Sequence, residues 1–114
     1  MTQSIFDEQK FLQSLAGDRE LAQELLGAFM DDSPVRSTSL ADALKNDDAN
    51  SVARLAHSLK GMCGVVRSDD LVALALSMEN AAKKGDLDKT STIFAEFKGM
   101  LILAQGEMQA FIDA

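Results

Sequence analysis

The segment Asp47–Ser68, DDANSVARLAHSLKGMCGVVRS, decides the fold, because it has a helical period along its whole length. At about 100° per residue, its apolar side chains fall within one arc of about 120°. These are Val52, Leu55, Ala56, Leu59, Met62, Cys63 and Val66. The segment therefore predicts an amphipathic helix over 49–66 with one face buried in a core.

Helical spacing continues upstream of this segment, and the alternating apolar runs and hairpin turns typical of strands are absent from the sequence. A short helix is expected over Ile5–Leu15, and Asp18 is a candidate N-cap for the next one. Ser33 and Pro34 have the pattern of a cap followed by proline at a first helical position. This pattern predicts that a separate helix begins at Pro34 and runs to about Asn46.

Two further helices are predicted downstream. Ser68 is expected to cap the first, which ends at Lys83-Lys84-Gly85. The second opens at Asp86 and has a long apolar stripe, made up of Ile93, Phe94, Phe97, Leu101, Ala104, Met108, Phe111 and Ile112. We therefore expect an all-α single domain over 1–114: an antiparallel four-helix bundle core with one or two additional short N-terminal helices. Ile102 and Leu103 are extra apolar residues that would suit another helix or a second subunit.

Composition excludes several classes of protein. The 114 residues include one Cys and one His, which excludes an internal disulfide, a zinc site of Cys and His ligands, and a di-iron bundle. The net charge of −7 opposes nonspecific binding to nucleic acid. No apolar run is long enough to span a membrane, and the N-terminus has no signal-peptide pattern. We expect a cytoplasmic protein with no metal and no cofactor of its own.

The single histidine, His57, lies about 170° from the centre of the apolar arc of its helix. Its neighbours on that side are Ala53, Gly61 and Gly64, with Lys60 on the flank. Because glycine inside a helix costs roughly 1 kcal/mol relative to Ala, two glycines beside the histidine need a reason. They either leave a flat, accessible platform around the imidazole or mark a helix that frays after Lys60.

The charge around His57 is opposite to that of the whole chain. No acidic residue occurs between Ala49 and Ser68, whereas Arg54, Lys60 and Arg67 do. An acidic partner would be attracted to this segment. An imidazole can be a nucleophile and carry a phosphoryl group, but the sequence has no nucleotide-binding glycine motif and no nucleophile-elbow motif. A phosphoryl group would therefore come from a partner, with Lys60 placed to neutralise its charge.

The stretch Ala56–Gly61, AHSLKG, with small residues at Cys63 and Gly64, resembles the signature of histidine-containing phosphotransfer (HPt) domains. The resemblance implies a four-helix bundle with an exposed active histidine. It implies that His57 accepts a phosphoryl group through Nε2 from the aspartyl phosphate of a response-regulator receiver domain and passes it to another receiver. Lys60 would stabilise the phosphoryl charge, while Gly61 and Gly64 would give access.

The same resemblance implies a phosphotransfer carrier without an ATP site, and not an enzyme in the usual sense. Its partners would be receiver domains and a sensor or hybrid histidine kinase, and the Mg²⁺ would be held by the receiver. Two alternatives stay open: a helical interaction module without transfer, and a phosphoacceptor phosphorylated by the ATP-binding domain of a kinase. The start at Met1 and the compact length favour a free-standing chain.

One position departs from the family pattern. Many members have a glycine where this chain has Arg67, directly after the predicted histidine helix. We therefore expect the bend after this helix to differ, and partner specificity with it.

Overall fold

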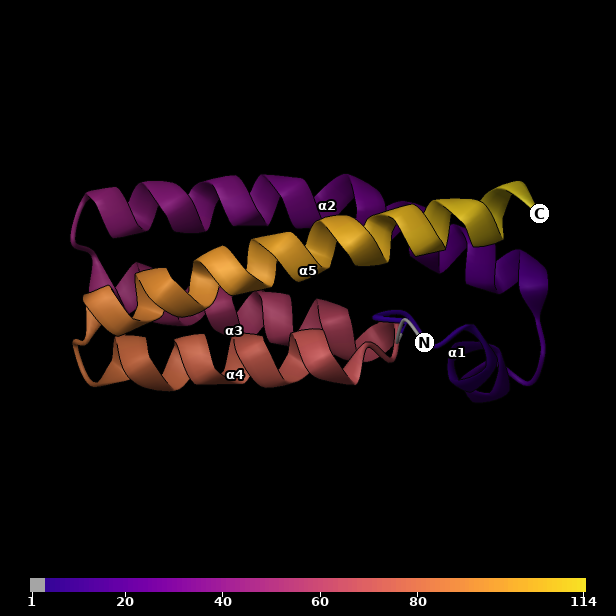
Figure 1. Cartoon of the computed structure of the whole chain (residues 1–114), viewed down its shortest axis with the longest axis horizontal. Helices are drawn as coiled ribbons and strands as arrows, with labels where there is room; N and C mark the ends of the chain where they lie inside the picture. Colours follow the sequence, from indigo (N-terminus) through magenta and orange to yellow (C-terminus); the bar gives the residue numbers. More distant parts are fainter. Residues whose placement is uncertain (1–3) are drawn as a thin grey trace.

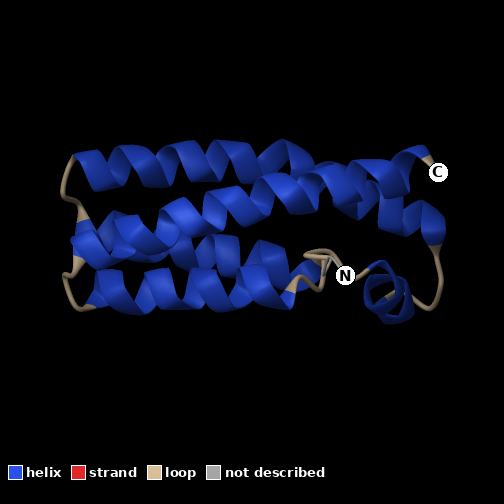
Figure 2. Cartoon of the chain, in the orientation of Figure 1, coloured by secondary structure: helices blue, strands red, loops and turns tan. Residues whose placement is uncertain are grey.

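The structure, a computed structural model that describes residues 4–114, contains five helices and no strand within that range (Figures 1 and 2). The helices are α1 (Glu8–Ser14), α2 (Arg19–Lys45), α3 (Ala49–Val65), α4 (Asp69–Lys83) and α5 (Leu87–Asp113). Helices α2 to α5 run alternately in opposite directions along the long axis of the molecule, and α1 lies at one end (Figure 1). The expected all-α bundle is confirmed, with one short N-terminal helix in addition to the four long ones.

The four long helices are arranged so that each packs on the next in the order α2, α3, α4, α5, and α5 packs on α2 again. The most extensive of these contacts is between α3 and α4. The predicted apolar stripes face inward: Val52, Ala56, Leu59 and Cys63 of α3 are fully buried, as are Leu71 and Met78 of α4. Phe97, Ala104 and Met108 extend the same core along α5. Burial of these stripes, rather than local propensity, supplies most of the stability of such helices.

The predicted break at Ser33-Pro34 is wrong, because α2 is one helix of 27 residues with Pro34 inside it. Ser33 is buried and its hydroxyl accepts a hydrogen bond from Gln105 Nε2 of α5 at 3.2 Å instead of capping a helix. Proline within a helix costs about 3 kcal/mol through the lost N–H and steric conflict. Packing of the flanking turns, through Phe29 and Leu40, holds the helix together across this position.

The first helix is shorter than expected and begins at Glu8, with Asp7 as its N-cap. The preceding residues are held by tertiary contacts instead. Glu107 Oε1 of α5 accepts hydrogen bonds from the backbone N–H groups of Ile5 and Phe6, each at 2.9 Å. The ring of Phe6 is buried against Phe11 and Phe111, so the N-terminal segment closes the end of the bundle.

The three loops between the long helices share one geometry, which explains their brevity. In each, one residue takes a left-handed conformation: Asp47 (φ 52°), Arg67 (φ 58°) and Gly85 (φ 75°). The N–H of the following residue then bonds to a carbonyl five residues earlier, as Ser68 N does to Cys63 O at 3.1 Å and Asp86 N to Ala81 O at 3.0 Å. This Schellman arrangement satisfies the last carbonyls of each helix. The bend at Arg67 is therefore made in the same way as the bend at Gly85.

Arg67 occupies a conformation that costs a residue with a Cβ about 1 kcal/mol or more, whereas glycine enters it freely. We expect Arg67→Gly to stabilise the chain by about 0.5 kcal/mol, because glycine's greater unfolded-state entropy offsets part of the gain. The measurement is thermal unfolding followed by circular dichroism. The reciprocal control, Gly85→Ala, should lower the melting temperature, and a lower melting temperature for Arg67→Gly would contradict this explanation of the bend.

Candidate functional site

His57 lies in the middle of α3, and 65% of its side chain is exposed. Its placement opposite the core follows from the helical period of the segment. Helix α3 continues past Gly61 and Gly64 to Val65, so the two glycines lie within the helix and do not mark a frayed end after Lys60. A Cβ added at either glycine would meet nothing within 4 Å. No contact within the described chain therefore requires a glycine at these two positions. The glycines leave the surface beside the imidazole without side chains.

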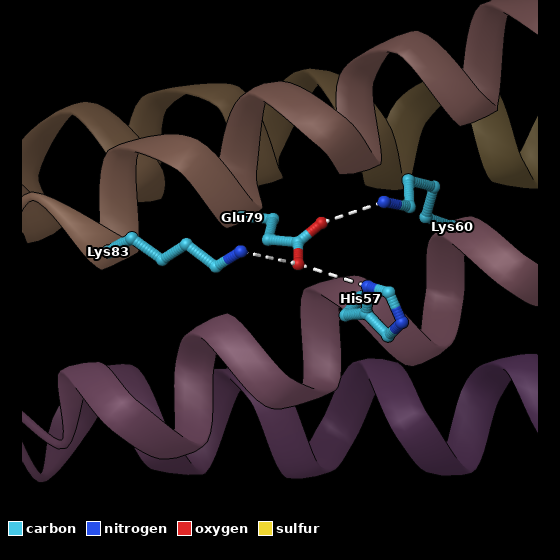
Figure 3. Close-up of polar contacts among 4 residues, drawn as sticks. All are labelled: His57, Lys60, Glu79 and Lys83. Carbon is cyan, nitrogen blue, oxygen red and sulfur yellow. Dashed lines mark hydrogen bonds and ion pairs between the residues drawn. The ribbon is translucent and has the colours of Figure 1, made fainter.

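A carboxylate that the sequence did not single out holds the imidazole (Figure 3). Glu79 projects from α4 toward α3, and its Oε2 lies 3.0 Å from Nδ1 of His57. Only 6% of the Glu79 side chain is exposed, whereas most of the imidazole is in solvent. A charge this deeply buried needs partners, because burying an unpaired carboxylate is strongly unfavourable.

Two lysines supply those partners. Lys60 Nζ, one turn along α3 from His57, donates to Glu79 Oε1 at 3.0 Å, and Lys83 Nζ lies 3.2 Å from Oε2 (Figure 3). The hydrogen bond from Lys60 lowers the pKa of Glu79 from its ordinary 4.5 to about 2, burial opposes this shift, and Lys83 adds to it. Glu79 is therefore ionised at neutral pH.

The ionised carboxylate determines the tautomer of His57. A carboxylate can only accept hydrogen bonds, so Nδ1 of His57 must carry the proton and donate it to Glu79. In a neutral imidazole the lone pair then resides on Nε2. Figure 3 shows this second ring nitrogen on the side of the ring away from Glu79. The site therefore presents a nucleophilic nitrogen to solvent with its orientation fixed by α4.

The contacts place two of the four predicted residues in one network and leave the others as surroundings. His57 and Lys60 both contact Glu79. Gly61 and Gly64 make no such contact and leave the surface beside the imidazole uncovered. Lys60 is only 28% exposed and its ammonium is already paired with Glu79. It therefore orients the carboxylate as well as providing positive charge beside the ring.

The sequence around Glu79 does indicate a buried, paired carboxylate, but the apolar pattern of α4 makes it easy to overlook. It lies four residues after Ala75 and three before Ala82, in line with the buried stripe of α4. An acidic residue in a buried stripe, with Lys83 four residues later, indicates a paired internal carboxylate. Its partner on α3 could not be read from the sequence, because the register between two helices depends on their packing.

Residues 4–114 form neither a reactive cysteine nor a metal site. Cys63 is fully buried, and burial raises the pKa of its thiol to about 12, so it is no nucleophile. Within residues 4–114 no group of three or more His, Cys, Asp and Glu side chains is arranged to hold a metal ion. None of the helices in that range has both the length and the apolar character to cross a membrane.

An antiparallel helical bundle that presents one oriented and exposed imidazole has the architecture of a histidine phosphotransfer domain. Comparison with protein families agrees: the chain belongs to the Hpt domain family, whose sequence model matches residues 24–107. Its structure is similar to that of histidine-containing phosphotransfer protein B (HptB) from Pseudomonas aeruginosa PAO1. The TM-score is 0.90 at 20% identity, covering 98% of this chain and 97% of that one. Comparison with curated proteins gives no match.

Membership of the family establishes the general role. The chain is a histidine phosphotransfer domain that serves the phosphorelays of two-component signalling. Proteins of this family carry phosphoryl groups and have no ATP site of their own, and they interact with receiver domains and histidine kinases.

Proposed function

We propose that His57 is the phosphoacceptor and that it relays a phosphoryl group through Nε2 between the aspartates of two receiver domains. The observation that carries this proposal is the 3.0 Å contact of Nδ1 with an ionised, buried Glu79. That contact leaves Nε2 as the one free nitrogen of the only histidine in the chain. Incubation with a phosphorylated receiver tests it: label should move to this chain and be lost in acid but retained in base.

The transfer step uses the network around Glu79 directly. The Nε2 lone pair attacks the phosphorus of the aspartyl phosphate, a P–N bond forms, and the P–O bond to the aspartate breaks. The ring keeps its Nδ1 proton and becomes positively charged. Glu79 lies against that proton and stabilises the charge as it develops. In the reverse direction the ring leaves the phosphorus as a neutral imidazole, so the same contact serves both transfers.

The metal ion for the transfer step would come from the partner. We infer that the receiver domain holds the Mg²⁺, and that this chain holds neither metal nor cofactor. The basic side chains near His57, which are Arg54, Lys60 and Lys83, favour approach of an acidic pocket in a chain whose overall charge is −7. A cytoplasmic location, where receiver domains and kinase output domains meet, fits this proposal.

An apolar groove about two helical turns from His57 is the surface on which we place the receiver. It lies between α2 and α3 and is lined by Leu25, Ala28, Phe29, Asp32, Met62, Val65 and Val66. Val65 is 54% exposed and stands two turns, about 12 Å, along α3 from His57. Around the helix axis the two differ by about 80°, so one partner can cover both.

We expect Val65→Glu to slow transfer roughly tenfold or more, because it places a charge in the apolar contact and repels an acidic partner. The measurement is the initial rate of label transfer from a phosphorylated receiver. Ile102→Glu is the matched control, since Ile102 is similarly exposed (67%) but belongs to α5. Equal rates for the two variants would place the receiver elsewhere.

Lys60→Ala is expected to slow transfer roughly tenfold to a hundredfold, because it removes a charged donor next to the transferring group. Lys83→Ala is its control: this lysine also pairs with Glu79, but it stands on α4 and is 62% exposed. If both lysines act only through Glu79, neither variant should lose more activity than Glu79→Gln, and Lys60→Ala should lose more than Lys83→Ala because Lys60 is the stronger partner of Glu79. A larger loss for Lys60→Ala than for Glu79→Gln, at equal thermal stability, indicates direct action of Lys60 on the phosphoryl group.

A further inference from the structure

Helix α5 has an outward face that differs from the rest of this acidic chain. Between Lys98 and Asp113 its exposed residues carry no charge; they are Gly99, Ile102, Leu103, Gly106, Gln109 and Ala110. Ile102 and Leu103 are 67% and 62% exposed, the first and third most exposed large apolar residues of the described chain. The one acidic residue in this stretch, Glu107, is engaged by the backbone of Ile5 and Phe6. We call these six residues the α5 face.

Two glycines make this face flat. Gly99 and Gly106 lie inside α5, where glycine is a poorer helix former than Ala. A Cβ at either position would meet nothing within 4 Å, so no contact within the described chain requires a glycine there. What the glycines do provide is room for the backbone of another helix to approach α5 from outside.

A polar group beside the α5 face also lacks a partner. Ser37 of α2 is 9% exposed, and its Oγ has no hydrogen-bond partner among the described residues. Ser37 lines a groove between α2 and α5 together with Pro34, Lys98, Leu101, Ile102 and Gln105. A buried hydroxyl without a hydrogen-bond partner is unfavourable, and a polar side chain from outside would supply the missing partner.

The charges at the two ends of the α5 face have opposite signs. Lys98 stands at one end, with its ammonium 4.8 Å from the centre of the Phe94 ring, and Asp113 stands at the other, accepting a hydrogen bond from Gln109 at 2.9 Å. They are 15 residues apart, or about 22 Å along the helix. When a second copy is rotated by 180° about an axis perpendicular to α5, the lysine end of each face meets the aspartate end of the other.

We propose that the α5 face is the interface of a homodimer in which the α5 helices of two copies pack antiparallel about a two-fold axis near Gly106. Each Lys98 then lies beside the second copy's Asp113 at a shallow crossing angle of about 20°. Ile102 and Leu103 pack against the second copy's Gly106 and Ala110. The second copy's Gln109 comes level with Ile102, where it can pair with Ser37.

The charges of the α5 face suit self-association. The chain has a net charge of −7, so two copies that met through acidic surfaces would repel each other, whereas the α5 face is locally neutral and its end charges match. Helix α5 packs on α4 and α2, so the dimer leaves His57 on α3 free for a receiver. One pair of helix faces is smaller than a standard interface of about 1,600 Å², so we expect a dissociation constant of roughly 100 μM.

Sedimentation velocity from about 10 μM to 1 mM tests the dimer, independently of phosphotransfer. The weight-average mass of the whole chain should rise from 12.3 kDa toward twice that value. Ile102→Glu should raise the dissociation constant at least tenfold, while Val65→Glu, on the other side of the bundle, should leave it unchanged. A monomer up to 1 mM, or equal association of the wild type and Ile102→Glu, would overturn the proposal.

A charge exchange tests the antiparallel geometry itself. Lys98→Asp and Asp113→Lys should each weaken self-association about tenfold, because each places like charges opposite one another at both ends. A mixture of the two variants should associate as the wild type does, since every end pair is then of opposite charge. Single variants that associate normally, or a mixture that does not recover, would rule out this register.

Discussion

Replacing His57 with Gln is expected to abolish phosphorylation of this chain by a receiver domain, with no residual label above background. The reason is that the chain has one imidazole and that its one reactive thiol candidate, Cys63, is fully buried and protonated. Glutamine retains an amide that can donate to Glu79, so the buried carboxylate keeps a partner. Because the His57 side chain is 65% exposed, its replacement should change the melting temperature little.

The position of the phosphoryl group on the ring can be measured as well. Nitrogen-15 NMR of the phosphorylated wild type should show phosphorus on Nε2 and a proton on Nδ1. Label that persists in His57→Gln would end the assignment of His57 as phosphoacceptor. Phosphorus on Nδ1 would instead show that the contact with Glu79 does not determine the nucleophile.

Replacing Glu79 with Gln is expected to have the second largest effect, because this residue acts on both stability and transfer. Its pKa of about 2 lies below the ordinary 4.5, so ionised Glu79 stabilises the fold above about pH 4.5. That stabilisation is lost as the pH falls from about 4.5 through 2. Glu79→Gln should therefore be less stable than the wild type by roughly 1–3 kcal/mol at pH 7, with the difference shrinking near pH 2.

Chemical denaturation of both proteins at a series of pH values measures this difference. Glu96→Gln is the control, since it removes one negative charge from an exposed position on α5. A stability difference that is the same at pH 7 and at pH 2 would contradict the ionised pair.

Transfer should also slow in Glu79→Gln, by roughly tenfold to a hundredfold, the size of effect typical of the hydrogen-bond partners that orient metal-ligating histidines. An amide can donate as well as accept, so it no longer forces the proton onto Nδ1. Nitrogen-15 shifts of the unphosphorylated imidazole should accordingly show both tautomers in the variant and mainly one in the wild type. Slow transfer with an unchanged tautomer would mean that Glu79 acts through charge alone.

Helical periodicity predicted most of this fold because it is a local property. The apolar arc of α3, the cap at Asp18 and the stop at Gly85 all depend on residues within a few positions of one another. Pro34 is the counterexample: its local pattern predicts a helix start, but burial of Phe29 and Leu40 on either side keeps it inside α2. Propensity differences of a few kcal/mol are outweighed where a helix is packed on both sides of the position.

The sequence by itself determined that the chain is helical, that its only histidine faces away from the core, and that small and basic residues surround it. Those features follow from a period of 3.6 residues along one helix. Only the tertiary structure decided how the imidazole is held, because Glu79 reaches His57 through the packing of α4 on α3, across 22 residues of sequence. The register between two helices is set by interlocking side chains, and through it the structure decides which ring nitrogen is free to react.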